Sequence, residues 1–215
     1  MSMAEAVPIP MFVLMWTAMM AAMMLPSVAP VALMWVRSIG SSSTKANRLG
    51  RNLLFISGYL GVWGSLGLVA YAGGLGMSML SNAYPQRSKW IVAGLFLTSG
   101  IYQLTPFKNA CLRHCRSPMS QLMGYAALKG AWRDLRVGLH HGLYCVGCCW
   151  GIMLVLIVVG TMNLLAAAGL AVVIFLEKSW TRGPLIAKMF GLALIGLGIV
   201  TLFTPMTALQ FAMSL

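Results

Sequence analysis

The sequence predicts an all-α fold, a polytopic membrane helix bundle with about six transmembrane helices and one amphipathic helix on the membrane surface. Composition is the first reason, because 60% of the 215 residues are hydrophobic and only 8% are charged. A soluble domain of this length needs far less apolar surface. The second reason is that long uncharged apolar runs recur along the chain. The third is that basic residues gather between alternate runs.

We interpret residues 1–215 as a single transmembrane domain. The expected spans are residues 8–36, 52–80, 89–107, 138–160, 162–176 and 184–212. Each should be a helix, because backbone polar groups in lipid must be satisfied within their own segment. The first apolar run is too long, and lacks the basic start, for a cleavable signal. The fifth span is short, so we expect it to tilt or to reach the interface through flanking residues.

The charges predict an orientation. Only three acids occur, Glu5, Asp134 and Glu177, against fifteen Lys and Arg. Thirteen basic residues follow the first, third and fifth spans: Arg37, Lys45, Arg48, Arg51, Lys108, Arg113, Arg116, Lys129, Arg133, Arg136, Lys178, Arg182 and Lys188. Only Arg87 and Lys89 lie on the other side. The positive-inside rule therefore places both termini on the outer side.

The net charge of +12 suggests a partner. In a soluble protein such a charge would suggest nucleic acid. Here no basic stripe is interleaved with exposed aromatics, so we expect no nucleic-acid partner. Basic loops facing anionic lipid explain the charge, and the lipid bilayer is the expected partner.

Residues 118–137 are predicted to form the surface helix. Pro118 suits a first helical turn. Basic and apolar side chains then separate onto two faces, which are formed by Lys129, Arg133 and Arg136 and by Leu128, Trp132 and Leu135. We expect Asp134 to pair locally with an arginine of this helix.

Glycines recur at the spacing of closely packed membrane helices. Gly58, Gly61, Gly64 and Gly67 form one row, and the pairs Gly138/Gly142 and Gly147/Gly151 form another. Small residues at such spacing let two helix backbones approach in lipid. We interpret these glycines as packing positions.

The stretch "HHGLYCVGCCWGIM" at 140–153 gathers soft metal ligands on one helical stripe. His141, Cys145 and Cys149 are spaced i, i+4 and i+8, and Met153 continues the row. Cys148 lies beside them. His140 points about 100° away and is the weaker candidate.

A second group, "CLRHC", places Cys111, His114 and Cys115 just after the third span. All five cysteines lie between positions 111 and 149, which indicates one site and not a disulfide framework. Buried cysteines also act as small apolar fillers. Thiolates and imidazoles bind zinc or copper, whereas Cys145-x-x-Cys148 is also typical of a redox dithiol. The adjacent Cys149 and the many methionines favour a metal.

Methionines of the first span add a soft, uncharged row. Met11, Met15, Met19 and Met23 follow one another at four-residue spacing, and Met20 and Met24 form a neighbouring row. Thioethers bind Cu(I) and hardly bind Zn(II) or Mg(II), so the row could relay copper. Flexible filling of a helix interface is the competing interpretation. Pro26 and Pro30 should kink this helix.

Glu177 is the acid that lies near a span end on the cytoplasmic side. An ionisable group there is a functional candidate. Pairing with Lys178, Arg182 or a neighbouring loop is the alternative.

The chain resembles a bacterial family of predicted metal-binding integral membrane proteins. The resemblance lies in "MWTAMMAAMMLPSVAP" at 15–30, "GYLGVW" at 58–63, "GIYQLTPFKNACLRHCRSP" at 100–118, "GLYCVGCCWGIM" at 142–153 and "GTMNLL…EK" at 160–178. It implies a copper chaperone, or a copper-delivery partner of an oxidase, in the bacterial inner membrane. The functional positions it implies are Met19, Met20, Met23, Met24, Cys111, Cys115, Cys145, Cys148, Cys149, Met162, Asn163 and Glu177. Copper itself is our inference from the sulfur ligands.

Three classes of function remain open at this point. The leading hypothesis is Cu(I) binding and delivery by a non-enzymatic protein, since no paired carboxylates or nucleophile triad occur. Its expected partner is a copper-dependent oxidase or another membrane subunit. The second is a thiol-disulfide oxidoreductase that uses Cys111/Cys115 and Cys145/Cys148. The third is a structural subunit bound through its glycine faces.

Overall fold

The computed structural model describes residues 7–38, 45–117, 124–125, 132–160 and 163–204. Within these ranges every long element is a helix, which confirms the all-α prediction there. The helices are α2 (Ile9–Ser38), α3 (Lys45–Ala83), α4 (Pro85–Leu104), α5 (Pro106–Arg116), α7 (Arg133–Val159), α8 (Leu164–Ser179) and α9 (Gly183–Phe203).

Four of these helices, α2, α3, α7 and α9, are long and apolar enough to cross a membrane. Helices α4 and α5 meet at a bend of 62° and count as a fifth span if together they form one broken crossing. Helix α8 has only 16 residues. The described chain therefore supports a helical membrane bundle, and the predicted count of six spans is not confirmed.

Two predicted elements, the surface helix and the last span, extend beyond what the structure describes. The surface helix predicted at 118–137 lies mostly outside the described residues. Its last part, from Arg133 to Val137, belongs to the first turns of α7, which runs without a break to Val159. The end of the last predicted span, beyond residue 204, is also outside the described residues.

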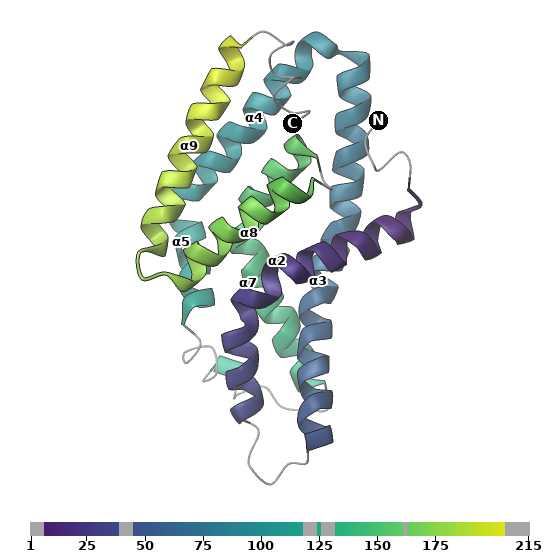
Figure 1. Ribbon diagram of the computed structural model, residues 1–215, viewed down its shortest axis with the longest axis vertical. Helices are drawn as coiled ribbons and strands as arrows, with labels where there is room; N and C mark the ends of the chain where they lie inside the picture. The colour runs from purple at the N-terminus through teal and green to yellow at the C-terminus, as the bar shows by residue number, and fades with distance from the viewer. Residues whose placement is uncertain (1–6, 39–44, 118–123, 126–131, 161–162, 205–215) are drawn as a thin grey trace.

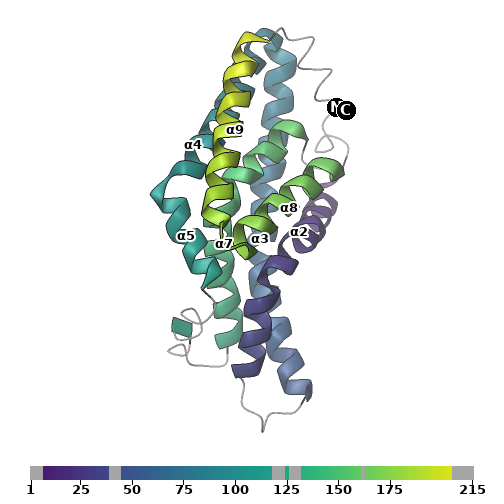
Figure 2. The same cartoon turned by 60° about the vertical axis from the view of Figure 1, so that its left-hand side comes forward.

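The helices form an elongated bundle. Figures 1 and 2 show α4 and α9 side by side, α3 running the length of the molecule, and α8 crossing the centre between them. Helix α2 changes direction part-way along its length (Figure 1), and it contains Pro26 and Pro30. Each proline removes a backbone donor and displaces a carbonyl, which explains the bend.

Glycines bring α3 against α7. A Cβ added to Gly138 would collide with the Phe55 carbonyl, and one added to Gly58 would collide with the Leu135 carbonyl. These glycines are therefore packing positions, as predicted. A Cβ added to Gly61 would meet nothing within 4 Å, so this glycine has no such role within the described chain.

Asp134 joins three helices instead of pairing locally, so our expectation for it was wrong. Its carboxylate accepts hydrogen bonds from Arg51 Nε at 2.9 Å and Nη2 at 3.0 Å. Trp35 Nε1 donates to the same carboxylate at 2.8 Å. The acid thus links α2, α3 and α7 at the end where the basic residues gather, because a buried charge needs partners from whatever elements surround it.

The number of membrane crossings determines whether the C-terminus lies on the same side of the membrane as the N-terminus. The distribution of basic residues predicts that both termini lie outside, and this prediction requires an even number of crossings. We expect a C-terminal tag in intact cells to be reachable by an impermeant reagent, and a tag in the 41–50 loop to be protected. A protected C-terminal tag together with an accessible N-terminal tag would show five crossings, with α4 and α5 as one broken span.

Candidate metal centre

Three cysteine thiols of α7 converge inside the bundle. The Sγ atoms of Cys145, Cys148 and Cys149 all lie within 4.8 Å of one another. We call these three residues the thiol cluster. Each side chain is at most 1% exposed, and the Sγ atoms of Cys148 and Cys149 are 3.3 Å apart. All five cysteines of the chain are free thiols.

The helix places these thiols together through its own geometry. Residues three and four apart share one helical face, so Cys148 and Cys149 both lie one turn beyond Cys145. The Cys148 Sγ also lies 3.1 Å from the Cys145 carbonyl oxygen, which accepts its hydrogen bond. The thiol cluster is therefore a local product of the α7 sequence, buried by the helices around it.

Helix α5 brings one further thiol to the thiol cluster. The Cys115 Sγ lies 3.8 Å from the Cys148 Sγ. Cys111, one turn earlier in α5, instead packs on α7 at Gly147, where an added Cβ would lie 3.0 Å from its sulfur. Of the two predicted cysteines of α5, the structure therefore brings Cys115 and not Cys111 to the thiol cluster.

Two polar side chains contact the Cys145 sulfur. The Tyr59 hydroxyl and the Lys178 ammonium each lie 3.0 Å from Cys145 Sγ. The ammonium also reaches Ser27 Oγ at 3.5 Å. A positive charge at this distance favours the thiolate, which is the form of cysteine that binds metals. Lys178 therefore favours the thiolate form of Cys145.

His141 carries an unused donor next to the thiol cluster. Its side chain is buried, and its Nδ1 has no hydrogen-bond partner. The imidazole packs between the rings of Phe55 and Tyr59, with centroids 6.1 and 6.0 Å away. It lies one turn before Cys145 but outside the close group of three thiols. A buried polar atom without a partner is costly, so its presence beside three thiols supports the predicted role as a ligand.

The sequence profile of the PpoB2 family, described as a copper chaperone, matches residues 13–201. The chain belongs to this copper chaperone family. Comparisons with curated proteins and with solved structures find no match. The matched region contains α3, α5, α7 and α8 and nearly all of α2.

The donor set of this PpoB2 family member fits copper. Thiolates are soft ligands that select Cu(I), zinc or iron–sulfur clusters. Closed zinc sites have four ligands, and the three close thiols together with Cys115 could supply that number, so the family match and not the ligand count favours copper. Three buried sulfurs and an unpartnered imidazole nitrogen of a neighbouring residue are soft and borderline donors of the kind that copper accepts.

Three of the methionines of α2 that were predicted as ligands are buried in the same core as the thiol cluster. Met20, Met23 and Met24 are buried and Met19 is half-buried. Ser27, one turn past Met23 and Met24, shares the Lys178 ammonium with Cys145. The inner end of the methionine row therefore reaches the vicinity of the thiol cluster.

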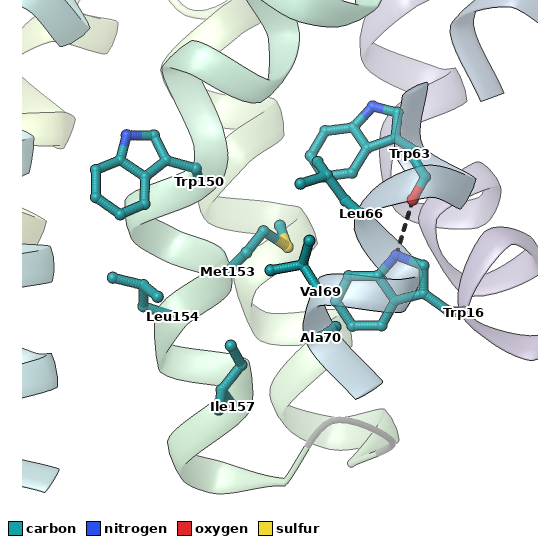
Figure 3. Close-up of a pocket in the computed structure, with 9 residues that line it drawn as sticks. All are labelled: Trp16, Trp63, Leu66, Val69, Ala70, Trp150, Met153, Leu154 and Ile157. Carbon is teal, nitrogen blue, oxygen red and sulfur yellow. Dashed lines mark hydrogen bonds between the residues drawn. The ribbon is translucent and has the colours of Figure 1, made fainter. Parts of the chain in front are cut away.

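Met153 lies one turn beyond Cys149 and lines an apolar cavity of about 110 Å³. Figure 3 shows this cavity between α7 and the Trp16 and Trp63 side of the bundle. Trp16 Nε1 donates to the Trp63 carbonyl at 3.1 Å on the far wall. Met162 lies outside the described residues.

Glu177 pairs with a lysine of α5. Its carboxylate lies 2.7 Å from Lys108 Nζ, and both side chains are nearly fully buried. Gln103 bonds both partners, and Arg116 donates to the Glu177 backbone carbonyl at 3.1 Å. The predicted alternative, pairing with a neighbouring basic segment, is therefore present, and metal ligation by Glu177 stays a prediction.

Asn163 and His114 have other contacts. Asn163 caps α8, since its Oδ1 accepts a hydrogen bond from Ala166 N at 3.0 Å. His114 stacks on Tyr144 with ring centroids 3.8 Å apart, beside and not within the thiol cluster. The predicted ligands thus divide between the thiol cluster and positions that surround it.

Sequence reasoning missed Tyr59, Lys178 and Lys108 as parts of this centre. The "EK" dipeptide was the available signal for two of these contacts, because a charged pair at the end of an apolar run must find partners. Glu177 forms an ion pair with Lys108, and the Lys178 ammonium contacts the Cys145 sulfur. No spacing rule predicts that division.

Proposed function

We propose that the protein binds Cu(I) at the thiol cluster and delivers it, within the membrane, to a copper-dependent oxidase. The observation that carries the proposal is the set of three buried thiols within 4.8 Å. Membership of a copper chaperone family supports copper as the cargo. The buried position of the three thiols supports metal binding, because an ion held there is removed from water and from competing oxygen ligands.

A chaperone must release its cargo, and the surroundings of the thiol cluster support exchange. Cys115 lies next to Cys148, so copper can change sulfur partners without leaving the protein. The methionine row of α2 offers thioethers, which bind Cu(I) without carrying a charge. We infer that the thiol cluster stores the ion and that the methionines conduct it.

The test is metal and thiol analysis of protein purified from copper-supplied cells. We expect copper bound to reduced thiols that resist alkylation, and a strong Cu(I) chelator should make them reactive. Zinc in place of copper would identify another cargo. Stoichiometric disulfide without copper would overturn the proposal.

The methionine row gives a separate kinetic prediction. Changing Met15, Met19 and Met23 together to Leu should slow copper transfer, because a thioether ligand is lost at each step while Leu fills a similar volume. Copper content at equilibrium should stay at the wild-type level. Single Met→Leu changes, as matched controls, should leave both quantities nearly intact. Wild-type transfer rates in the triple variant would show that the methionine row serves only to pack α2 against its neighbours.

A thiol-disulfide oxidoreductase is the second candidate. The contact between Cys115 and Cys148, at 3.8 Å across two helices, favours it. On that hypothesis, metal-free protein should contain a fraction of disulfide that disappears with reductant. Alkylation before and after reduction measures that fraction, and a fully reduced metal-free protein would argue against this candidate.

A further inference from the structure

A second group of possible metal ligands lies outside the thiol cluster. His114 of α5 and His140 of α7 both face Tyr125, whose hydroxyl is 3.4 Å from His114 Nε2 and 3.4 Å from His140 Nδ1. The two imidazole centroids are 6.0 Å apart. Tyr144 stacks on His114 and contacts His140 with centroids 5.0 Å apart. We call His114 and His140 the imidazole pair.

The imidazole pair is more exposed than the thiol cluster. His140 is exposed, and His114 and Cys115 are half-buried. Cys148, which Cys115 contacts, is 1% exposed, and Cys145 is fully buried. His114 and Cys115 are consecutive residues of α5, so one short stretch of this helix supplies one side chain to the imidazole pair and one to the contact with the thiol cluster. Each of these side chains can bind a soft or borderline metal ion.

We propose that the imidazole pair is a second Cu(I) site, a transfer port that exchanges copper with the thiol cluster through Cys115. The proposal rests on the proposed copper function of the thiol cluster. It makes His140 a copper ligand. Helical spacing alone does not predict this role, because His140 lies away from the cysteine stripe of α7. Two imidazole nitrogens from different helices converge on one point, now held by the Tyr125 hydroxyl, and imidazole is a suitable ligand for copper.

The exchange is a ligand substitution without electron transfer. A copper–nitrogen bond to the imidazole pair breaks as a copper–sulfur bond to Cys115 forms. The proton of the Cys115 thiol passes to the imidazole nitrogen that copper has left. Copper stays Cu(I) throughout, and the next substitution moves it to Cys148, 3.8 Å away.

Packing alone is the competing explanation, because Tyr125 and Tyr144 could hold the imidazoles as an ordinary aromatic cluster. The two explanations differ in metal stoichiometry. A port binds an ion of its own when the thiol cluster is removed, whereas a packing cluster binds none.

The first experiment measures Cu(I) binding by the full chain in lipid nanodiscs, with a chromophoric Cu(I) chelator as competitor. In a Cys145→Ser/Cys148→Ser/Cys149→Ser background we expect about one weakly held Cu(I) per chain, bound through nitrogen. Adding His114→Ala and His140→Ala should abolish it. Absence of that ion while both histidines are present would overturn the port.

The second experiment measures how fast the chelator withdraws copper from chains with an intact thiol cluster. The double His→Ala variant and Cys115→Ser should each lose copper more slowly than the wild type, by roughly tenfold if the effect on transfer matches the smallest effect of supporting groups on metal affinity or activity. The copper held by the thiol cluster at equilibrium should be unchanged in both variants. Arg136→Ala, an exposed change one turn before His140, is the matched control. Wild-type rates in both variants would overturn the port and leave the thiol cluster standing.

The two proposals fail in different ways. If the triple Cys→Ser chain holds as much copper as the wild type, the proposed function of the thiol cluster fails and the port loses its exchange partner, while a histidine-dependent ion still shows that the imidazole pair binds Cu(I). Should the double alanine variant misfold, His114→Asn with His140→Asn keeps the size and polarity of both side chains and is read in the same way.

Discussion

Cys145→Ser is expected to remove most of the bound copper. Cys145 carries one sulfur of the thiol cluster and is the one that Lys178 and Tyr59 contact. Serine keeps the size but offers a hard, protonated hydroxyl that binds Cu(I) poorly. We expect affinity to fall by more than roughly 100-fold, since even the groups that support metal ligands contribute 10- to 100-fold. Competition with a Cu(I) chelator measures this affinity.

Cys111→Ser is the matched control. Cys111 is also buried in the bundle, but its sulfur packs against Gly147 and does not belong to the thiol cluster. Its change should leave copper affinity near the wild-type value, and Cys149→Ser should resemble Cys145→Ser. Full copper occupancy in Cys145→Ser would show that the cysteines of α7 do not form the copper site.

Lys108→Met is expected to cause the largest loss of stability. Lys108 and Glu177 are both buried and 2.7 Å apart, so removing the lysine leaves an unpaired carboxylate in the interior. Breaking a buried ion pair from one side costs about 3–5 kcal/mol. We expect the free energy of unfolding to fall by about that much, measured by denaturation in detergent.

A double-mutant cycle separates the pair from its surroundings. Lys108→Met with Glu177→Met should recover most of the loss, because two apolar side chains of similar volume leave no buried charge. Arg113→Met, an exposed change in the same helix, should alter stability by less than about 1 kcal/mol. A double variant that loses the sum of both single effects would show that the two charges act independently.

Local periodicity predicted the parts of the centre that one helix determines. The spacing of Cys145, Cys148 and Cys149 fixes their shared face on α7, so their convergence could be read from the sequence. The kink at Pro26 and Pro30 and the close approach at Gly138 follow from equally local rules. The all-α fold follows from composition, because lipid permits few other structures.

Contacts between helices could not be predicted in this way. Helical spacing puts Cys111 and Cys115 on one face of α5, but the rotation of α5 against α7 decides which of them meets Cys148. Glu177 and Lys108 are 69 positions apart, and Asp134 and Arg51 are 83 apart. The number of spans also depends on packing, because α8 is apolar but has only 16 residues.

The most direct test of the account is X-ray absorption spectroscopy at the copper edge on the copper-loaded chain. We predict Cu(I) bound by two or three sulfur atoms in the wild type, with at least one fewer in Cys145→Ser. A copper environment of nitrogen and oxygen alone, or a sulfur count unchanged in that variant, would contradict copper binding at the thiol cluster.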